Sequence, residues 1–312
     1  MALTGHRIVV LRALGLGDLL TAVPALRALR RGTPGARVTL AAPAGLGPLA
    51  RSTGAVDDVV PADGLAPLPP LGPVGTAVNL HGRGPESHRV LAALPPRRLL
   101  AFACAGAGHA DGPAWDPDEH EVARWCRLVS SYGFAADPGD LDLPAPAGPS
   151  PAPGAVVVHP GAAFPARRWP ADRFAAVAAA LRDGGERVVV TGGPGETALA
   201  RRVVDLAGLP VEADLSGRTR LTELAALVAG ARLVVCGDTG VAHLATAYRT
   251  PSVLLFGPTP PARWGPPARD EHLVLWAGRR GDPHGSEPCP GLLEISADDA
   301  VAAAGRALTR TR

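Results

Sequence analysis

The chain opens with the apolar run Ile8-Val9-Val10-Leu11, followed by Gly15-Leu16-Gly17-Asp18 and then by an amphipathic run over residues 19–29. The short β-branched run predicts a buried parallel strand, and the spacing of the later apolar residues predicts a helix. A glycine pair between a strand and a helix lets the backbone approach a ligand closely. The stretch therefore predicts an α/β fold with a binding turn after its first strand.

The same alternation recurs along the whole chain. Further strands are predicted at residues 38–40, 58–60, 77–80, 99–102, 156–158, 187–190, 233–235 and 253–256. Helices are predicted at residues 119–132, 171–181, 196–206, 221–228 and 241–247, with a last one that Ser296 caps and that runs to about residue 308. Strands that alternate with helices imply crossover connections and parallel sheets.

One stretch interrupts the alternation. Residues 144–154 read PAPAGPSPAPG and have no apolar periodicity, so they predict a semi-stiff linker. We expect an N-terminal domain over residues 1–147 and a C-terminal domain over residues 154–312, with the final helix (about 296–309) packed back on the N-terminal domain. A length of 312 residues fits two domains. Two α/β domains joined in this way bind ligands in the cleft between them.

Composition and charge exclude several classes of protein. The 31 Lys and Arg residues, all of them Arg, nearly balance 29 Asp and Glu residues, which argues against a nucleic-acid partner. The four cysteines are far apart in sequence, so neither a disulfide framework nor a cysteine zinc site is expected. With no leader-like pattern and no apolar stretch of about 20 residues, we expect a cytoplasmic protein that touches a membrane at most peripherally.

Asp18 is the distinctive residue of the first turn. The turn is a poor dinucleotide fingerprint, because Leu20 stands where the third glycine is required. A carboxylate at the mouth of a cleft can remove a proton from an incoming hydroxyl. Aspartate at this position can equally cap the helix. The residues alone leave both roles open.

A second turn combines glycine with two arginines. His159-Pro160-Gly161-Ala162 ends a strand, and Arg167-Arg168-Trp169-Pro170 follows. Backbone N–H groups in such a turn can face an anion, and arginine binds phosphate with two parallel hydrogen bonds. A solvated basic loop is the alternative interpretation.

Two further glycine turns lead from strands into helices. In Gly192-Gly193-Pro194-Gly195-Glu196, the carboxylate of Glu196 can accept hydrogen bonds from vicinal hydroxyls, although the helix dipole alone also favours an acid there. In the segment 237–243 (GDTGVAH), the first N–H groups of a helix suit a diphosphate. Asp238 is better suited to sugar hydroxyls, and His243 either faces the same ligand or is structural.

Several common catalytic motifs are missing from the sequence. It has no H-E-x-x-H, no G-x-S-x-G and no phosphate-binding loop with lysine, and Asp116-Pro117-Asp118 is better interpreted as a turn and cap. We therefore expect neither metal nor cofactor. An enzyme that uses a nucleotide sugar without a metal must neutralise the diphosphate it releases with helix N-termini and arginine, and the sequence supplies both.

The ordered set of motifs resembles glycosyltransferase family 9, which adds ADP-activated heptose to the inner core of lipopolysaccharide. The matching segments are Gly15–Leu20 with Pro24–Leu26, Asn79–Gly82, His120-x-Val122-x-Arg124, His159–Ala162 with Arg167–Pro170, Gly192–Glu196, Leu215–Thr219, Gly237–His243, Phe256–Thr259 and Cys289–Ile295.

This resemblance implies a GT-B fold, in which two Rossmann-like domains have parallel sheets facing across a cleft. It implies a metal-independent, inverting glycosyltransferase that moves a sugar from a nucleotide-sugar donor to a glycan, glycolipid or small-molecule acceptor. Asp18 matches the proposed base of the family, and Arg167 matches a phosphate-binding lysine. The donor-binding set is Gly161, Arg167, Glu196, Thr219, Asp238, Thr239, Gly240 and His243. The acceptor side is Gly17, His81 and Arg83.

The chain also departs from the family pattern. Pro260 and Pro261 stand where the family often has an acid, and its C-terminal cysteine-rich stretch is reduced to Cys289. The acceptor and the sugar therefore stay open. The runner-up function is a nucleotide-sugar epimerase of the same architecture. A solute-binding protein would need an export signal, and the broken fingerprint argues against a dehydrogenase.

Overall fold

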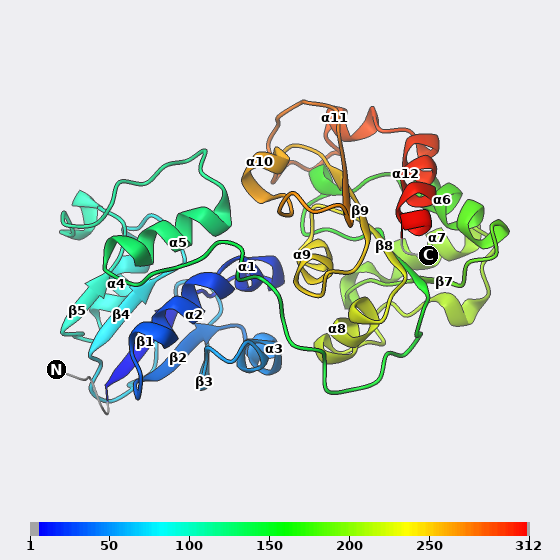
Figure 1. Cartoon of the computed structure of the whole chain (residues 1–312). Helices are drawn as coiled ribbons and strands as arrows, with labels where there is room; N and C mark the ends of the chain where they lie inside the picture. Colours follow the sequence, from blue (N-terminus) through cyan, green and yellow to red (C-terminus); the bar gives the residue numbers. More distant parts are fainter. Residues whose placement is uncertain (1–5, 311–312) are drawn as a thin grey trace. The chain divides into compact units, whose positions relative to one another are not determined.

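The computed structural model describes residues 6–310 (Figure 1). The chain divides into two compact units, Met1–Pro144 and Ala145–Arg312. The division lies at the start of the proline-rich stretch at residues 144–154. Each unit contains one five-stranded sheet in which all paired strands are parallel, so the predicted α/β class is confirmed.

The first unit has the strand order β3-β2-β1-β4-β5. Its strands are β1 (Arg7–Leu11), β2 (Arg37–Ala42), β3 (Asp58–Pro61), β4 (Thr76–Asn79) and β5 (Arg98–Leu100). Its helices are α1 (Leu16–Thr21), α2 (Val23–Gly32), α3 (Gly47–Ser52), α4 (Glu86–Ala92) and α5 (Glu121–Ser131), with 3₁₀ turns η1 (Ala44–Leu46) and η2 (Ala105–Ala107). The strand order reverses between β1 and β4, which is where such sheets bind ligands.

The helix predicted over residues 19–29 is two helices in the structure. Ala22 ends α1 and precedes α2, and Pro24 occupies the second position of α2. A proline in the first helical turn loses no hydrogen bond, whereas inside a continuous helix it would break one. The break therefore leaves α1 as a short, separate helix that carries Asp18.

The second unit has the strand order β10-β9-β8-β6-β7. Its strands are β6 (Val156–His159), β7 (Val188–Val190), β8 (Leu233–Gly237), β9 (Ser252–Phe256) and β10 (His272–Trp276). Its helices are α6 (Ala171–Asp183), α7 (Thr197–Leu206), α8 (Leu221–Ala229), α9 (Gly240–Ala247), α10 (Pro261–Trp264), α11 (Pro290–Leu293) and α12 (Ala297–Arg310), with 3₁₀ turns η3 (Pro165–Arg167), η4 (Pro194–Glu196) and η5 (Val211–Ala213).

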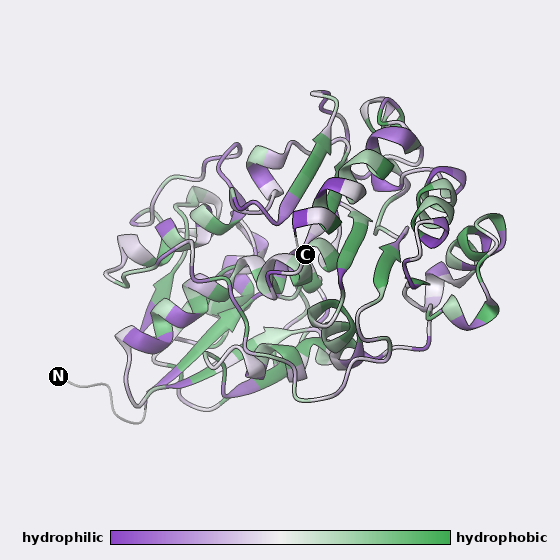
Figure 2. Cartoon of the chain, turned by 45° about the vertical axis from the view of Figure 1, so that its right-hand side comes forward, coloured by the Kyte–Doolittle hydropathy of each residue, from purple (hydrophilic) through white to green (hydrophobic). Residues whose placement is uncertain are grey.

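The apolar strands form the centre of the hydrophobic core in each unit. Figure 2 shows hydrophobic residues concentrated in the strands of both sheets. Central strands such as β1 and β8 are buried along almost their whole length, because helices cover both faces of a parallel sheet. In this sheet too the order reverses, between β6 and β8. None of the helices in residues 6–310 is long and apolar enough to cross a membrane.

The final helix belongs to the second unit. Helix α12 packs against α6 and against strands β8, β9 and β10 of its own unit. Its buried residues are Ala300, Ala303, Ala304, Ala307 and Leu308, which belong to the core cluster of the second unit. The four small alanine side chains let the helix lie close to the elements beneath it. These contacts make the helix part of the core of the second unit, and its packing on the N-terminal domain stays a prediction.

Candidate functional site

Asp18 lies in the first turn of α1, near the reversal point of the first sheet. Its Oδ2 accepts a hydrogen bond at 3.2 Å from the N–H of Gly15, which is the N-cap residue, so Asp18 caps α1 from the third helical position. Its Oδ1 lies 3.3 Å from Nη2 of Arg12. The side chain remains 27% exposed, so a ligand can still reach the carboxylate. Capping and proton transfer are thus compatible roles for this residue.

The surroundings make Asp18 more basic than an ordinary aspartate. Burial raises its pKa above the usual value of 3.8, and the negative charge of Glu121 adds to this increase. The charge of Arg12 and the N–H of Gly15 act in the opposite direction and reduce the increase without abolishing it. A raised pKa makes a carboxylate a better proton acceptor once it is ionised.

Arg12 connects several parts of this site, and the sequence analysis missed it. The residue follows β1 directly and is 1% exposed. Its guanidinium donates to the carbonyl oxygens of Asp18 and Leu80, to Oγ1 of Thr21 and to Oε1 of Glu121. The available signal was a charged residue directly after the apolar run 8–11, because a cation buried there requires partners.

The predicted acceptor side lies around the same edge of the sheet. His81 follows β4, and its backbone N–H donates to Oδ1 of Asn79 at 3.0 Å. Burial and the charge of Arg12 lower its pKa to about 4, so its ring is neutral near pH 7. Gly17 is half-buried in α1, and Arg83 is exposed in the turn after β4. The structure thus brings Asp18 and His81 to one charged centre, while Arg83 lies at the surface.

In the second unit, Arg167 and Asp238 come together from two turns. Nη1 of Arg167 lies 4.0 Å from Oδ2 of Asp238, which is 5% exposed. Nε of Arg167 is buried and has no hydrogen-bond partner among the described residues. The neighbouring Arg168 donates instead to the carbonyl of Ala162 within its own loop. Of the two adjacent arginines, only Arg167 therefore lies beside Asp238 and the turn that opens α9.

Helix α9 begins beside this arginine. Thr239 is its N-cap residue and has extended backbone, but its side chain makes no capping hydrogen bond. The first N–H groups of a helix lack intrahelical partners and bind anions well. His243 lies one turn further on, with its ring edge-to-face against Trp264 at 5.8 Å between centroids. Thr239 and Gly240 are thus placed as donors close to Arg167.

Glu196 is held in place by a neighbouring turn. Its Oε2 accepts from the N–H of Gly193 at 2.7 Å and lies 4.0 Å from Nε2 of His159. Burial lowers the pKa of His159, more than the nearby carboxylate raises it. The loop that carries Thr219 is joined to the same turn, because the N–H of Gly217 donates to the carbonyl of Gly192.

Gly161 lies directly against Glu196. A Cβ at Gly161 would lie 2.2 Å from Oε1 of Glu196. We expect Gly161→Ala to displace the carboxylate and to weaken ADP binding by roughly two- to tenfold, the effect of losing one hydrogen bond. Isothermal titration calorimetry measures this. Gly195→Ala is the matched control, since nothing lies within 4 Å of a Cβ there. Equal losses in both variants would contradict this role for Gly161.

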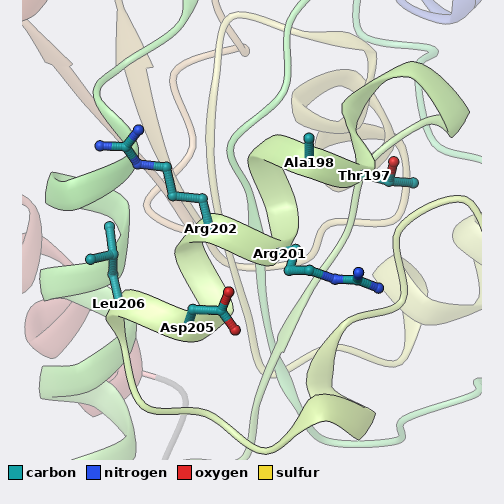
Figure 3. Close-up of a pocket in the computed structure, with 6 residues that line it drawn as sticks. All are labelled: Thr197, Ala198, Arg201, Arg202, Asp205 and Leu206. Carbon is teal, nitrogen blue, oxygen red and sulfur yellow. The ribbon is translucent and has the colours of Figure 1, made fainter.

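A hollow of about 520 Å³ lies elsewhere on the second unit. It follows the surface of α7, as Figure 3 shows, and contains none of the predicted site residues. Its lining residues are Thr197, Ala198, Arg201, Arg202, Asp205 and Leu206. Within residues 6–310, no three His, Cys, Asp or Glu side chains gather as a metal site would require.

Comparison with known proteins places the chain in a family. The model of glycosyltransferase family 9 (heptosyltransferase) matches residues 114–291, more than half of the sequence. The chain belongs to this family.

Individual relatives agree with the family match. Lipopolysaccharide heptosyltransferase 3 of Escherichia coli K12 is 36% identical over 127 residues, which are 39% of this chain and 36% of that protein. Lipooligosaccharide heptosyltransferase 2 of Haemophilus influenzae is 34% identical over 122 residues, 37% of this chain and 34% of that protein. The matched segments thus span about a third of the length of these relatives.

Solved structures share the fold over nearly the whole chain. A family 9 glycosyltransferase from Veillonella parvula has a TM-score of 0.80 at 21% identity and covers 99% of both chains. ADP-heptose lipopolysaccharide heptosyltransferase II of E. coli has a TM-score of 0.78 at 20% identity and covers 97% of this chain and 99% of that one. The predicted fold class is confirmed by these neighbours.

Proposed function

We propose that this protein is an inverting, metal-independent glycosyltransferase. It transfers a sugar, with heptose the first candidate, from a nucleoside diphosphate, with ADP the first candidate, to an acceptor hydroxyl. The observation that carries the proposal is the arrangement around Arg167. A buried, unpartnered Nε and the uncapped start of α9 lie on one side of the second unit, where a diphosphate would need donors.

The donor contacts divide among three turns and one further loop of the second unit. Arg167 and the N–H groups of Thr239 and Gly240 neutralise the phosphates. Glu196 accepts from the ribose hydroxyls, and Thr219 lies on the loop beside the base. Asp238 and His243 face the sugar.

The chemical step requires a base for the acceptor. The carboxylate of Asp18 takes the proton of the acceptor hydroxyl as its oxygen forms a bond to the anomeric carbon. The bond from that carbon to the diphosphate oxygen breaks, and the electron pair leaves with the diphosphate. Attack from the face opposite to the leaving group inverts the anomeric configuration. Gly17, His81 and Arg83 border the acceptor.

The acceptor itself is a glycan, a glycolipid or a small molecule. The names of the relatives given above include lipopolysaccharide or lipooligosaccharide. These names favour a glycolipid as the acceptor. We propose a cytoplasmic protein with peripheral membrane contact and without a nucleic-acid partner. The matching family consists of glycosyltransferases, and the E. coli neighbour is a heptosyltransferase by its name. The epimerase alternative is therefore not favoured.

A panel of nucleotide sugars tests the donor. We expect ADP-heptose to raise the melting temperature most, because a ligand that binds only the folded state stabilises it. Release of the nucleoside diphosphate should then depend on an added acceptor. An epimerase would interconvert sugars without any acceptor, and that result would overturn the proposal.

Chelation tests the role assigned to arginine and the helix N-terminus. We expect EDTA to leave turnover unchanged, because Arg167 and α9 supply the positive charge that a metal would otherwise provide. Turnover measured after dialysis against EDTA, with and without added Mg²⁺, is the measurement. A loss that Mg²⁺ restores would contradict the metal-independent mechanism.

A further inference from the structure

One guanidinium is shared between two carboxylates in the first unit. Nη2 of Arg12 lies 2.9 Å from Oε1 of Glu121 and 3.3 Å from Oδ1 of Asp18. The side chain of Arg12 is 1% exposed and packs over the ring of Trp125, 4.7 Å from its centroid. The closer ion pair is therefore the one with Glu121, not the one with the proposed base.

Glu121 is fixed from several directions. It lies in the first turn of α5 and is 5% exposed. Its Oε1 also accepts from Nε1 of Trp125 at 2.8 Å, and its Oε2 pairs with Arg124. Helix α5 packs against α2, so the carboxylate is anchored by tertiary contacts and by its own helix. The Glu121 carboxylate is too buried to contact solvent or a ligand freely. It can therefore affect the site only through the residues that it binds.

We propose that Glu121 is a positioning residue for Asp18, because it holds Arg12 and prevents that guanidinium from closing a full ion pair with the base. Asp18 then keeps a carboxylate that is oriented by Arg12 and free to accept a proton. The role as stated rests on the proposed function, in which Asp18 is the base.

The electrostatics of the two acids agree with this geometry. Arg12, Glu121 and the N–H of Gly15 act on Asp18, and the nearby His81 is neutral. The pKa of Asp18 is raised, chiefly by burial. Burial also favours the neutral form of Glu121, but Arg12, Arg124 and Trp125 outweigh it and lower its pKa. The more deeply buried acid is thus the one that Arg12 keeps ionised.

The test is Glu121→Gln, read by carboxyl ¹³C titration of Asp18. The amide keeps an oxygen for Arg12 and removes the charge, so the guanidinium acts fully on Asp18. We expect the pKa of Asp18 to fall by about 0.5–1 unit, and the acid limb of the kcat/KM profile to move by the same amount. Asp18→Asn identifies the resonance. Glu121→Asp, which keeps the charge, should restore most of the wild-type titration.

Glu119→Gln is the matched control. Glu119 pairs with Arg127 just before α5, and among the described residues its carboxylate makes no contact with Arg12. Its carbonyl accepts from Arg124, and the substitution leaves that contact in place. Its titration of Asp18 and its pH profile should equal those of the wild type. A Glu121→Gln protein with an unchanged Asp18 titration would overturn the inference. A titration that moves while the pH profile stays fixed would support the link to Glu121 and overturn Asp18 as the base.

If the Glu121→Gln variant does not fold, a measurement on the wild-type protein still tests the inference. In the unaltered protein, Glu121 should titrate at lower pH than Asp18, although it is the more buried of the two. The opposite order would overturn the inference without any substitution.

Discussion

Replacing Asp18 with Asn should lower turnover by about 10²–10⁴-fold, because the amide cannot take the proton of the acceptor. Donor binding should persist, since the proposed donor contacts all lie in the second unit. Steady-state release of the nucleoside diphosphate and calorimetric binding of ADP measure the two quantities. Near-normal turnover in this variant would leave Asp18 with its capping role alone.

The raised pKa of Asp18 also predicts how the same substitution changes the stability of the folded protein. The pKa of Asp18 is raised in the folded state above 3.8, so folding disfavours the ionised form. The stabilisation linked to the neutral acid is fully present below the unfolded pKa and is lost as the pH rises through the folded pKa. At pH 7 the wild type therefore carries an unfavourable charge.

Asp18→Asn removes that charge and keeps a side-chain oxygen that can accept from the N–H of Gly15. We expect its melting temperature at pH 7 to equal or exceed that of the wild type, with the difference vanishing in acid. A clear decrease at pH 7 would contradict the sign worked out here.

Arg167→Ala should weaken ADP binding by about 10- to 150-fold. Charge-assisted hydrogen bonds contribute about 1.5–3 kcal/mol, and each 1.4 kcal/mol is about tenfold in affinity. The guanidinium has a buried Nε that a phosphate oxygen can satisfy. Arg167→Lys should recover part of the loss, since lysine keeps the charge but not the planar fork.

Arg168→Ala is the control for this experiment. That side chain holds the carbonyl of Ala162, so its loss should lower the melting temperature more than it lowers ADP affinity. Equal dissociation constants for Arg167→Ala and Arg168→Ala would show that the assignment to Arg167 is wrong.

Much of the fold was predictable from the sequence, because buried parallel strands are continuous apolar runs. The pattern placed β1, β2, β6 and β9 within a few residues of their bounds. It missed β10, an edge strand whose residues are mostly half-exposed and follow the charged segment 269–271. It also missed the break between α1 and α2, since apolar periodicity continues across Ala22.

Only those residues of the candidate site that lie close together in the sequence could be predicted from it. Glycine turns after strands identify Gly161, Glu196 and the start of α9, since each turn follows its strand directly. The link from Arg12 to Glu121 joins residues 109 positions apart. It depends on where α5 packs against α2, which no local pattern encodes.

The packing of α12 also bears on how the chain folds as it is synthesised. The first unit ends at Pro144, so all of its strands are available while the rest of the chain is still being translated. The core cluster of the second unit joins Val156 and Val158 of β6 to Ala300, Ala303 and Ala307 of α12, which are made about 150 residues later. This sheet cannot complete its core until α12 has left the ribosome. During that interval a chaperone that covers exposed apolar strands would act mainly on the second unit, long after the first has folded.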